Sequence, residues 1–257
     1  MSTMSIGLAM FGAMLVLMAV RVPIAIAMFV PGALGYMVLA GWLPLLSHLK
    51  GAVYGRVSVY DLSVIPLFML MGAFAVQGGL SKALFDFANA LLGRFKGGMA
   101  MAGVLACAAF GSISGSTVAT TATIAQVAYP EMRRIHYSGR LATAALATGG
   151  TMGVLLPPSV TLMVYAILTE QNITKMFLAA YVPALLAALG YLIAIALIVR
   201  IHPDQAPEAQ AVPASELVAS GLRVWPIVAI FLVVFGGIYG GLFTATEGAA
   251  IGNIMTF

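Results

Sequence analysis

Charge is what this sequence has least of. Only 8% of its 257 residues are charged, while 62% are hydrophobic and the mean hydropathy is +1.06. Soluble domains carry about 25% charged residues. Apolar runs of about 18 or more residues recur along the chain, and each is long enough to cross a bilayer as a helix. The composition therefore excludes an ordinary soluble domain and predicts an all-α, multi-pass membrane protein.

Cysteine, histidine and acidic residues are also scarce: the chain has one Cys, three His and eight Asp plus Glu. The single Cys107 cannot form an internal disulfide, and packing is its expected role. No group of His, Cys, Asp and Glu has metal-ligand spacing, so we expect neither a transition-metal site nor a cofactor. The net charge is +4, and the basic residues lie at the ends of apolar segments. Basic residues in these positions set membrane topology, so we expect a lipid bilayer as the partner and no nucleic acid.

Six apolar segments are expected to be transmembrane helices: residues 4–20, 24–46, 63–78, 141–168, 176–200 and 224–242. Polar loops are expected at 47–62 and 201–222. Residues 80–96 have helical periodicity, with an apolar stripe of Leu80, Leu84, Phe87, Leu91 and Phe95. Because charged residues mostly face elsewhere, this segment predicts an amphipathic helix that lies in the membrane interface.

Residues 98–130 contain no charge, yet the run Gly111–Thr117 in their middle, GSISGST, is small and rich in hydroxyls. One unbroken helix would be about 50 Å long, well beyond the ~30 Å hydrocarbon core. Broken at this run, the segment gives two arms of about 21 Å, each too short to span. The pattern favours a re-entrant hairpin with its tip near mid-membrane, where protein or a watery cavity must cover the backbone. The alternatives are one long helix with a Gly/Ser packing seam, or two poorly bounded spans.

Basic clusters flank the hairpin. They are Lys82, Arg94 and Lys96 before it and Arg133, Arg134 and Arg140 after it. A hairpin that returns to its own side puts both clusters on one face, which the positive-inside rule makes cytoplasmic. Counting back through three spans then places the N-terminus in the periplasm. A fully spanning 98–130 would separate the clusters, so the charge bias favours the hairpin.

A second polar break, GGTMGVLLPPS, interrupts 141–168 from Gly149 to Ser159. Pro157 and Pro158 lack backbone N–H groups, and a proline inside a helix costs about 3 kcal/mol. The helix is therefore expected to unwind there, which frees carbonyls and exposes half-helix ends. Such breaks hold coupling cations and anionic substrates in secondary transporters. A proline-kinked helix satisfied by its neighbours is the alternative.

An enzyme is the competing class, because SISG resembles the surroundings of the nucleophile in intramembrane serine proteases. That chemistry needs a base within hydrogen-bond reach of the serine. The histidines His48, His136 and His202 lie in expected loops, and neither polar break contains an acidic residue. We therefore expect a protein that is not an enzyme. His136 is interpreted as part of the basic topology anchor.

Two long motifs carry a family resemblance: FGSISGSTVATTATIAQVAYPEMRR and GGTMGVLLPPSVTLMVYA. Both resemble the large membrane subunit (DctM-like, M) of tripartite ATP-independent periplasmic (TRAP) transporters, as does WPIVAIFLVVFGGIYGGLFTATEGAA. The resemblance implies an elevator-type permease, multi-pass in the bacterial inner membrane, that imports a small organic acid by sodium symport. It also implies two partners, a small four-helix membrane subunit (DctQ-like) and a periplasmic substrate-binding protein (DctP-like).

In that family the hairpin tip and the following broken helix contribute to a sodium site beside the substrate cavity. By motif, this role carries over onto Ser112, Ser114, Gly115, Ser116, Gly149, Gly150, Thr151, Gly153, Pro157 and Pro158. Thr117 and Ser159, which end the two polar stretches, complete the candidate set. The hypothesis is that hydroxyls and carbonyls of both stretches bind Na⁺ together, without a formal negative charge.

The family's subunit is much longer and consists of two inverted repeats. This sequence resembles one complete repeat, residues 1–222, with scaffold helices, the hairpin 98–130 and the broken helix 141–168. Residues 223–257 resemble the start of an incomplete second repeat, in which Glu247 is expected to cap a helix N-terminus. A transport site shared between repeats would be half built, so a truncated, transport-incompetent structural or assembly subunit is the alternative function.

Overall fold

The computed structural model describes residues 3–58, 60–207 and 213–257, and among these the regular elements are all helices. An apolar chain satisfies its backbone hydrogen bonds within each helix, which is the requirement that a bilayer imposes. The chain divides into two compact units, Met1–Val59 and Tyr60–Phe257. The all-helical class expected from composition is confirmed.

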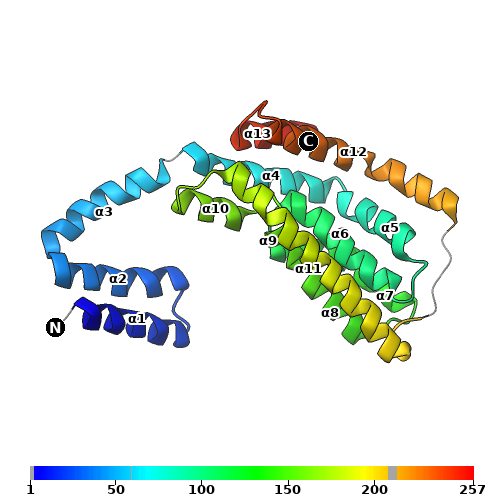
Figure 1. The fold of residues 1–257 in the computed structure, drawn as a ribbon, viewed down its shortest axis with the longest axis horizontal. Helices are drawn as coiled ribbons and strands as arrows, with labels where there is room; N and C mark the ends of the chain where they lie inside the picture. Colours follow the sequence, from blue (N-terminus) through cyan, green and yellow to red (C-terminus); the bar gives the residue numbers. More distant parts are fainter. Residues whose placement is uncertain (1–2, 59, 208–212) are drawn as a thin grey trace. The chain divides into compact units, whose positions relative to one another are not determined.

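The first unit holds α1 (Thr3–Ala19), α2 (Ile24–Ala40) and α3 (Trp42–Val57). The chain turns between α1 and α2 at Arg21, which has a φ of 65°. The two helices then lie side by side (Figure 1), and a Cβ on Gly35 would lie 2.8 Å from Met10 Cγ. The expected segment 24–46 ends early, because Gly41 adopts a φ of 93° and starts a new helix. The prediction of a loop over 47–62 is thus wrong for most of that stretch, which α3 occupies.

The second unit contains the remaining helices. In chain order they are η1 (Tyr60–Ser63), α4 (Val64–Gln77), α5 (Leu80–Leu92), α6 (Gly98–Ser114), α7 (Thr117–Arg134), α8 (Gly139–Gly150), α9 (Met152–Leu155), α10 (Val160–Leu168), α11 (Ile173–Ile201), η2 (Pro203–Gln205), α12 (Ala214–Tyr239) and α13 (Ala245–Thr256).

Helix α6 is the core of this unit. Nearly all of its side chains are buried, and α4, α5, α7, α8, α9 and α11 pack around it. Small residues permit this close approach. A Cβ on Gly149 of α8 would lie 3.0 Å from Val104 Cα and 3.3 Å from Cys107 Sγ. Cys107 is fully buried at this contact, so it serves packing, as expected.

Helix α5 is bent 70° from α4, with Gly78 and Gly79 between them. It is amphipathic, and part of its apolar face is covered by other helices. Leu84, Phe85 and Ala88 are buried, and α5 packs against α6 and α12. The predicted stripe is therefore divided, because Leu84 is buried within the protein while Leu91 and Phe95 at its far end are exposed, and the interfacial position stays a prediction.

By length and composition, three described helical segments could cross a membrane: Gly139–Leu168, Ile173–Ile201 and Ser215–Tyr239. The bent pair α4–α5 makes a fourth if it counts as one span. Helices α1 and α2 are apolar but have 17 residues each, slightly fewer than the ~20 that usually span. That the chain crosses the membrane six times stays a prediction. The described residues do form several helices that are apolar enough for a membrane.

Candidate functional site

The hairpin tip is a two-residue turn between α6 and α7. Gly115 adopts the left-handed conformation, with φ 61°, and its N–H donates to Gly111 O over 2.9 Å. Ser116 is extended and caps α7, because its Oγ accepts from Ala119 N–H over 3.3 Å. Helices α6 and α7 pack on each other. The break predicted within Gly111–Thr117 is confirmed.

The base of the hairpin is closed by Tyr137, in the turn that follows α7. Met99 N–H at the start of α6 donates to the Tyr137 hydroxyl over 3.2 Å, and the side chain is buried. Burial raises the pKa of Tyr137, so the phenol stays neutral. Arg133 Nη1 donates to Tyr137 O over 2.8 Å and holds the same turn. The two ends of the 98–130 segment therefore lie together, as a hairpin requires.

The second break also falls where the sequence predicts it. Helix α8 ends at Gly150, the single turn α9 follows, and the chain is non-helical from Leu156 to Ser159 before α10 begins. The Pro157–Pro158 peptide bond in this stretch is cis. Ser159 is fully buried and caps α10, since Leu162 N–H donates to its Oγ over 3.3 Å.

The two breaks meet in the structure. A Cβ on Gly111 would lie 2.6 Å from Gly153 Cα, and one on Gly115 would lie 2.8 Å from Pro158 O. A Cβ on Gly153 would lie 2.9 Å from Ser116 O. Only residues without a side chain allow backbones this close. The glycines in the candidate set thus join the hairpin tip to the broken helix.

Four half-helix ends converge at this contact. The N-termini of α7 and α10 lie close together, because a Cβ on Gly115 would be 3.5 Å from Val160 N. Both N-termini carry a serine cap, and they present partial positive charge. The C-terminal ends of α6 and α9 present carbonyl oxygens. Such a junction can hold an anion against the N-termini and a cation against the carbonyls.

The hydroxyls of the candidate set differ in their surroundings. Ser114 Oγ and Thr120 Oγ1 form a buried pair at 2.7 Å. Ser112 Oγ donates to Ala109 O over 2.7 Å. Thr151 is exposed, donates to Thr148 O over 2.6 Å, and lies 3.1 Å from the Tyr191 hydroxyl of α11. Their lone pairs are the acceptors that a hard cation would use.

Burial divides the twelve candidates into three groups. Ser112, Ser114, Gly115, Gly149, Gly150, Gly153, Pro157, Pro158 and Ser159 are buried. Ser116 and Thr117 are half-buried, and Thr151 is exposed. All of them belong to the two breaks that meet.

Sequence reasoning missed Thr120 and Thr121 of α7, which face the broken helix. A Cβ on Gly153 would lie 2.8 Å from Thr120 Oγ1, and one on Gly150 would overlap with Thr121 Oγ1. The signal was present, since Thr117, Thr120 and Thr121 share one helical face at i, i+3 and i+4. Gly72 of α4 was also missed. A Cβ there would lie 2.9 Å from Ser114 Cα, so α4 supports the tip.

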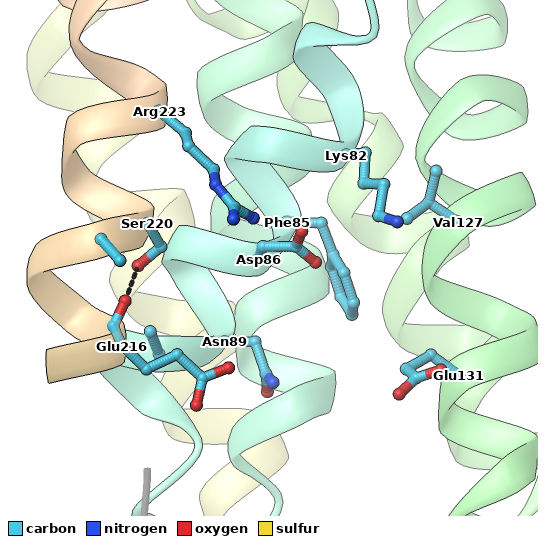
Figure 2. A pocket seen from close by; sticks show the side chains of 11 residues that line it. Lys82, Phe85, Asp86, Asn89, Val127, Glu131, Glu216, Ser220 and Arg223 are labelled. Atoms are coloured by element: carbon cyan, nitrogen blue, oxygen red, sulfur yellow. Dashed lines mark hydrogen bonds between the residues drawn. The ribbon is translucent and has the colours of Figure 1, made fainter. Parts of the chain in front are cut away.

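A separate cavity of about 600 Å³ lies between α5, α7 and α12 (Figure 2). Lys82, Asp86 and Asn89 of α5 face Glu216, Ser220 and Arg223 of α12 across it, and Glu131 of α7 lines its other side. No candidate of the hairpin-tip site lines this cavity. Among the described residues, no three His, Cys, Asp or Glu side chains are placed to hold a metal ion.

Comparison with known proteins identifies relatives for nearly the whole chain. The family model described as tripartite ATP-independent periplasmic transporter, DctM component, matches residues 11–257. The C4-dicarboxylate TRAP transporter large permease protein DctM of Pseudomonas aeruginosa is 39% identical over 196 residues, which cover 76% of this chain and 45% of that protein.

The protein of the same name from Vibrio cholerae is 38% identical over 199 residues, 77% of this chain and 43% of that protein. The isethionate TRAP transporter permease protein DctMQ of Oleidesulfovibrio alaskensis is 32% identical over 242 residues, 94% of this chain and 38% of that protein. The matched region thus spans less than half the length of these three relatives.

Proposed function

Because this chain belongs to the DctM family of TRAP transporter large permeases, we propose that a protein containing it imports a small organic acid anion, coupled to sodium entry. The observation that carries the proposal is the contact between the hairpin tip and the broken helix, where four half-helix ends converge. The family is one of transporters, not enzymes.

The proposed cation site uses oxygen atoms of both breaks. Carbonyls at the ends of α6 and α9 and the hydroxyls of Ser114, Ser116 and Thr151 supply hard ligands with little side-chain bulk. The paired N-termini of α7 and α10 supply the partial positive charge that suits a carboxylate. Without a formal negative charge, sodium affinity depends on the number of ligands. Each lost ligand is therefore expected to matter.

The substrate class rests on the relatives. The three relatives described above are named for C4-dicarboxylates and isethionate, which are both small organic anions. Nothing in residues 111–117 or 149–159 selects between such anions, because neither stretch contains a charged side chain. We propose that a periplasmic, DctP-like binding protein makes the first selection and delivers the anion.

A small four-helix, DctQ-like membrane subunit is the second proposed partner. One relative carries the name DctMQ, which joins the two subunit designations in a single permease protein. We place the complex in the bacterial inner membrane, with the basic ends of the hairpin in the cytoplasm and the N-terminus in the periplasm. Elevator motion of one repeat against the other completes the proposal, and it requires sequence beyond this repeat.

A transport-incompetent structural or assembly subunit is the alternative. In this case the chain would assemble with a DctQ-like subunit but would give no sodium-dependent uptake, whether alone or with its partners.

Uptake into proteoliposomes tests the proposal. The permease containing this sequence is reconstituted with its small subunit, and the binding protein is supplied outside with labelled C4-dicarboxylate. We expect uptake that requires an inward sodium gradient. Ser114→Ala, Ser116→Ala and Thr151→Val should each raise the sodium concentration for half-maximal uptake about five- to 150-fold, the equivalent of about 1–3 kcal/mol.

Ser58→Ala is the matched control, because its hydroxyl is exposed and donates only to Tyr54 O within α3. It should leave sodium dependence unchanged. Sodium-independent uptake would overturn the coupling, and absence of uptake from a well-folded complex would favour the assembly subunit. If all three hydroxyl variants keep the original sodium dependence, the ligands are carbonyls alone.

A further inference from the structure

An apolar groove of about 590 Å³ lies at one end of the second unit, between the α5–α6 connection and the last turns of α11. Leu92, Phe95, Met101 and Ile193 line its apolar part, and Lys96 and Arg200 line it as well. Phe95 and Ile193 are about half exposed, so the groove opens outward from the helix bundle.

Lys96 and Arg200 line the same groove, next to a close contact between the Gly97 backbone and the Val199 side chain. Gly97 has a φ of 79°, and a Cβ there would lie 2.9 Å from Val199 Cγ2. Lys96 and Arg200 are the chain neighbours of Gly97 and Val199, which places both cations beside this contact. Arg94 lies over the Phe95 ring, with Cζ 5.1 Å from the centroid, and adds a third cation at the same end.

Nothing in the described part of the chain neutralises this pair of cations. Neither Lys96 nor Arg200 makes a hydrogen bond or ion pair there, and no acidic side chain lines the groove. The single described ion pair joins Arg134 to Glu131 on α7. An apolar groove that ends in two unpaired cations is complementary to a molecule with an apolar chain and an anionic head.

We propose that this groove binds one anionic phospholipid of the phosphatidylglycerol type. Its phosphodiester lies between the Arg200 guanidinium, which can donate two parallel hydrogen bonds, and the Lys96 ammonium. An acyl chain lies along Leu92, Met101 and Ile193. Basic pockets between membrane helices on the cytoplasmic side bind anionic headgroups in this way, and the groove lies among the basic residues that the charge bias assigns to that side.

The inference goes beyond the proposed transport function, and its test needs no transport. The 257-residue chain is purified in a mild detergent and titrated with phosphatidylglycerol or phosphatidylcholine, and native mass spectrometry counts bound lipid. We expect one saturable phosphatidylglycerol and no comparable phosphatidylcholine. Lys96→Gln and Arg200→Gln should each weaken phosphatidylglycerol binding about five-fold, because each basic residue near an anionic lipid surface contributes about a five-fold gain in affinity. The double variant should weaken binding about 30-fold.

Two controls distinguish specific binding in the groove from general attraction of lipid to a basic surface. Arg140→Gln removes a cation of the basic cluster that follows the hairpin, outside the groove, and should leave binding unchanged. Ala196→Trp keeps every charge but fills the groove, which Ala196 lines, and should abolish tight binding. The Ala196→Trp variant also tests the groove independently if one of the charge variants fails to fold.

Four results would overturn the proposal. Equal affinity for phosphatidylcholine would remove the charge selectivity. Equal weakening by Arg140→Gln would indicate diffuse attraction. Competition by inorganic phosphate at matched ionic strength would identify a free-anion site, and displacement of the lipid by the small subunit would identify a protein interface.

Discussion

At the scale of single residues, glycine decides whether the two breaks can meet. Gly111 lies at the closest backbone approach between the two breaks, where an added Cβ would be 2.6 Å from Gly153 Cα. Because backbone atoms cannot rotate away, Gly111→Ala must push α6 and α9 apart. We expect a loss of about 1–3 kcal/mol in stability, measured as a lower midpoint of thermal unfolding in detergent.

Gly190→Ala on α11 is the matched control, since nothing lies within 4 Å of its added Cβ. There the change should be neutral or stabilising by up to about 1 kcal/mol, because alanine favours helix. If Gly111→Ala were equally harmless, the contact between the tip and the broken helix would be looser than described.

The buried pair of Ser114 and Thr120 makes a different kind of prediction. Either single variant, Ser114→Ala or Thr120→Val, leaves its partner hydroxyl without that hydrogen bond and should cost about 1–3 kcal/mol. The double variant removes both groups and should cost clearly less than the sum. A double-mutant cycle of unfolding free energies measures this coupling, and strict additivity would show that the pair contributes nothing.

At the scale of elements, α5 shows what periodicity alone can and cannot determine. Its helical, amphipathic character followed from the spacing of apolar residues. Which apolar residues are buried did not follow, because α6 and α12 cover the face centred on Phe85. Phe85→Ala should therefore cost about 3–5 kcal/mol, as loss of a fully buried aromatic does, when measured by unfolding.

Leu91→Ala, near the exposed end of the same helix, is the companion variant and should cost much less. A helix whose apolar face lay against lipid would give the opposite result, with Phe85→Ala nearly neutral. The two variants thus separate packing on the protein from a free interfacial position.

Both helix breaks were predictable because their causes are local. Gly115 provides the left-handed turn, and Pro157 and Pro158 interrupt the helix that would otherwise join α8 to α10. That the breaks touch each other depends on glycines far apart in sequence, and only the motif resemblance suggested it. Thr120 was missed because its role comes from Ser114, which it meets across the turn.

The capping of α13 was predictable for the same local reason. Thr244 Oγ1 accepts from Glu247 N–H over 3.3 Å, and Thr244 N–H donates to Glu247 Oε2 over 2.8 Å. This reciprocal capping box is the N-terminal role expected for Glu247. The boundary at Gly41 was not predicted, since the apolar pattern continues past it and only its positive φ marks the end of α2.

At the scale of the whole molecule, the hairpin makes a definite prediction about sidedness. Tyr137 accepts from Met99 N–H, so both ends of the hairpin lie at one end of the second unit, and Lys82 of α5 lines the same cavity as Glu131 near the end of α7. Cysteines at Lys82 and at Arg134, whose side chain is 73% exposed, should therefore react with an impermeant maleimide from the same side. The positive-inside rule makes that side the cytoplasm.

The assay is run on inside-out and right-side-out vesicles in a Cys107→Ala background, although Cys107 is itself buried. A cysteine at Lys175, at the opposite end of α11 from Arg200, is the control and should react only from the periplasm. Labelling of positions 82 and 134 from opposite sides would mean that 98–130 spans. Labelling of both from the periplasm would keep the hairpin but invert the topology, and the lipid groove beside Arg200 would then face the other leaflet.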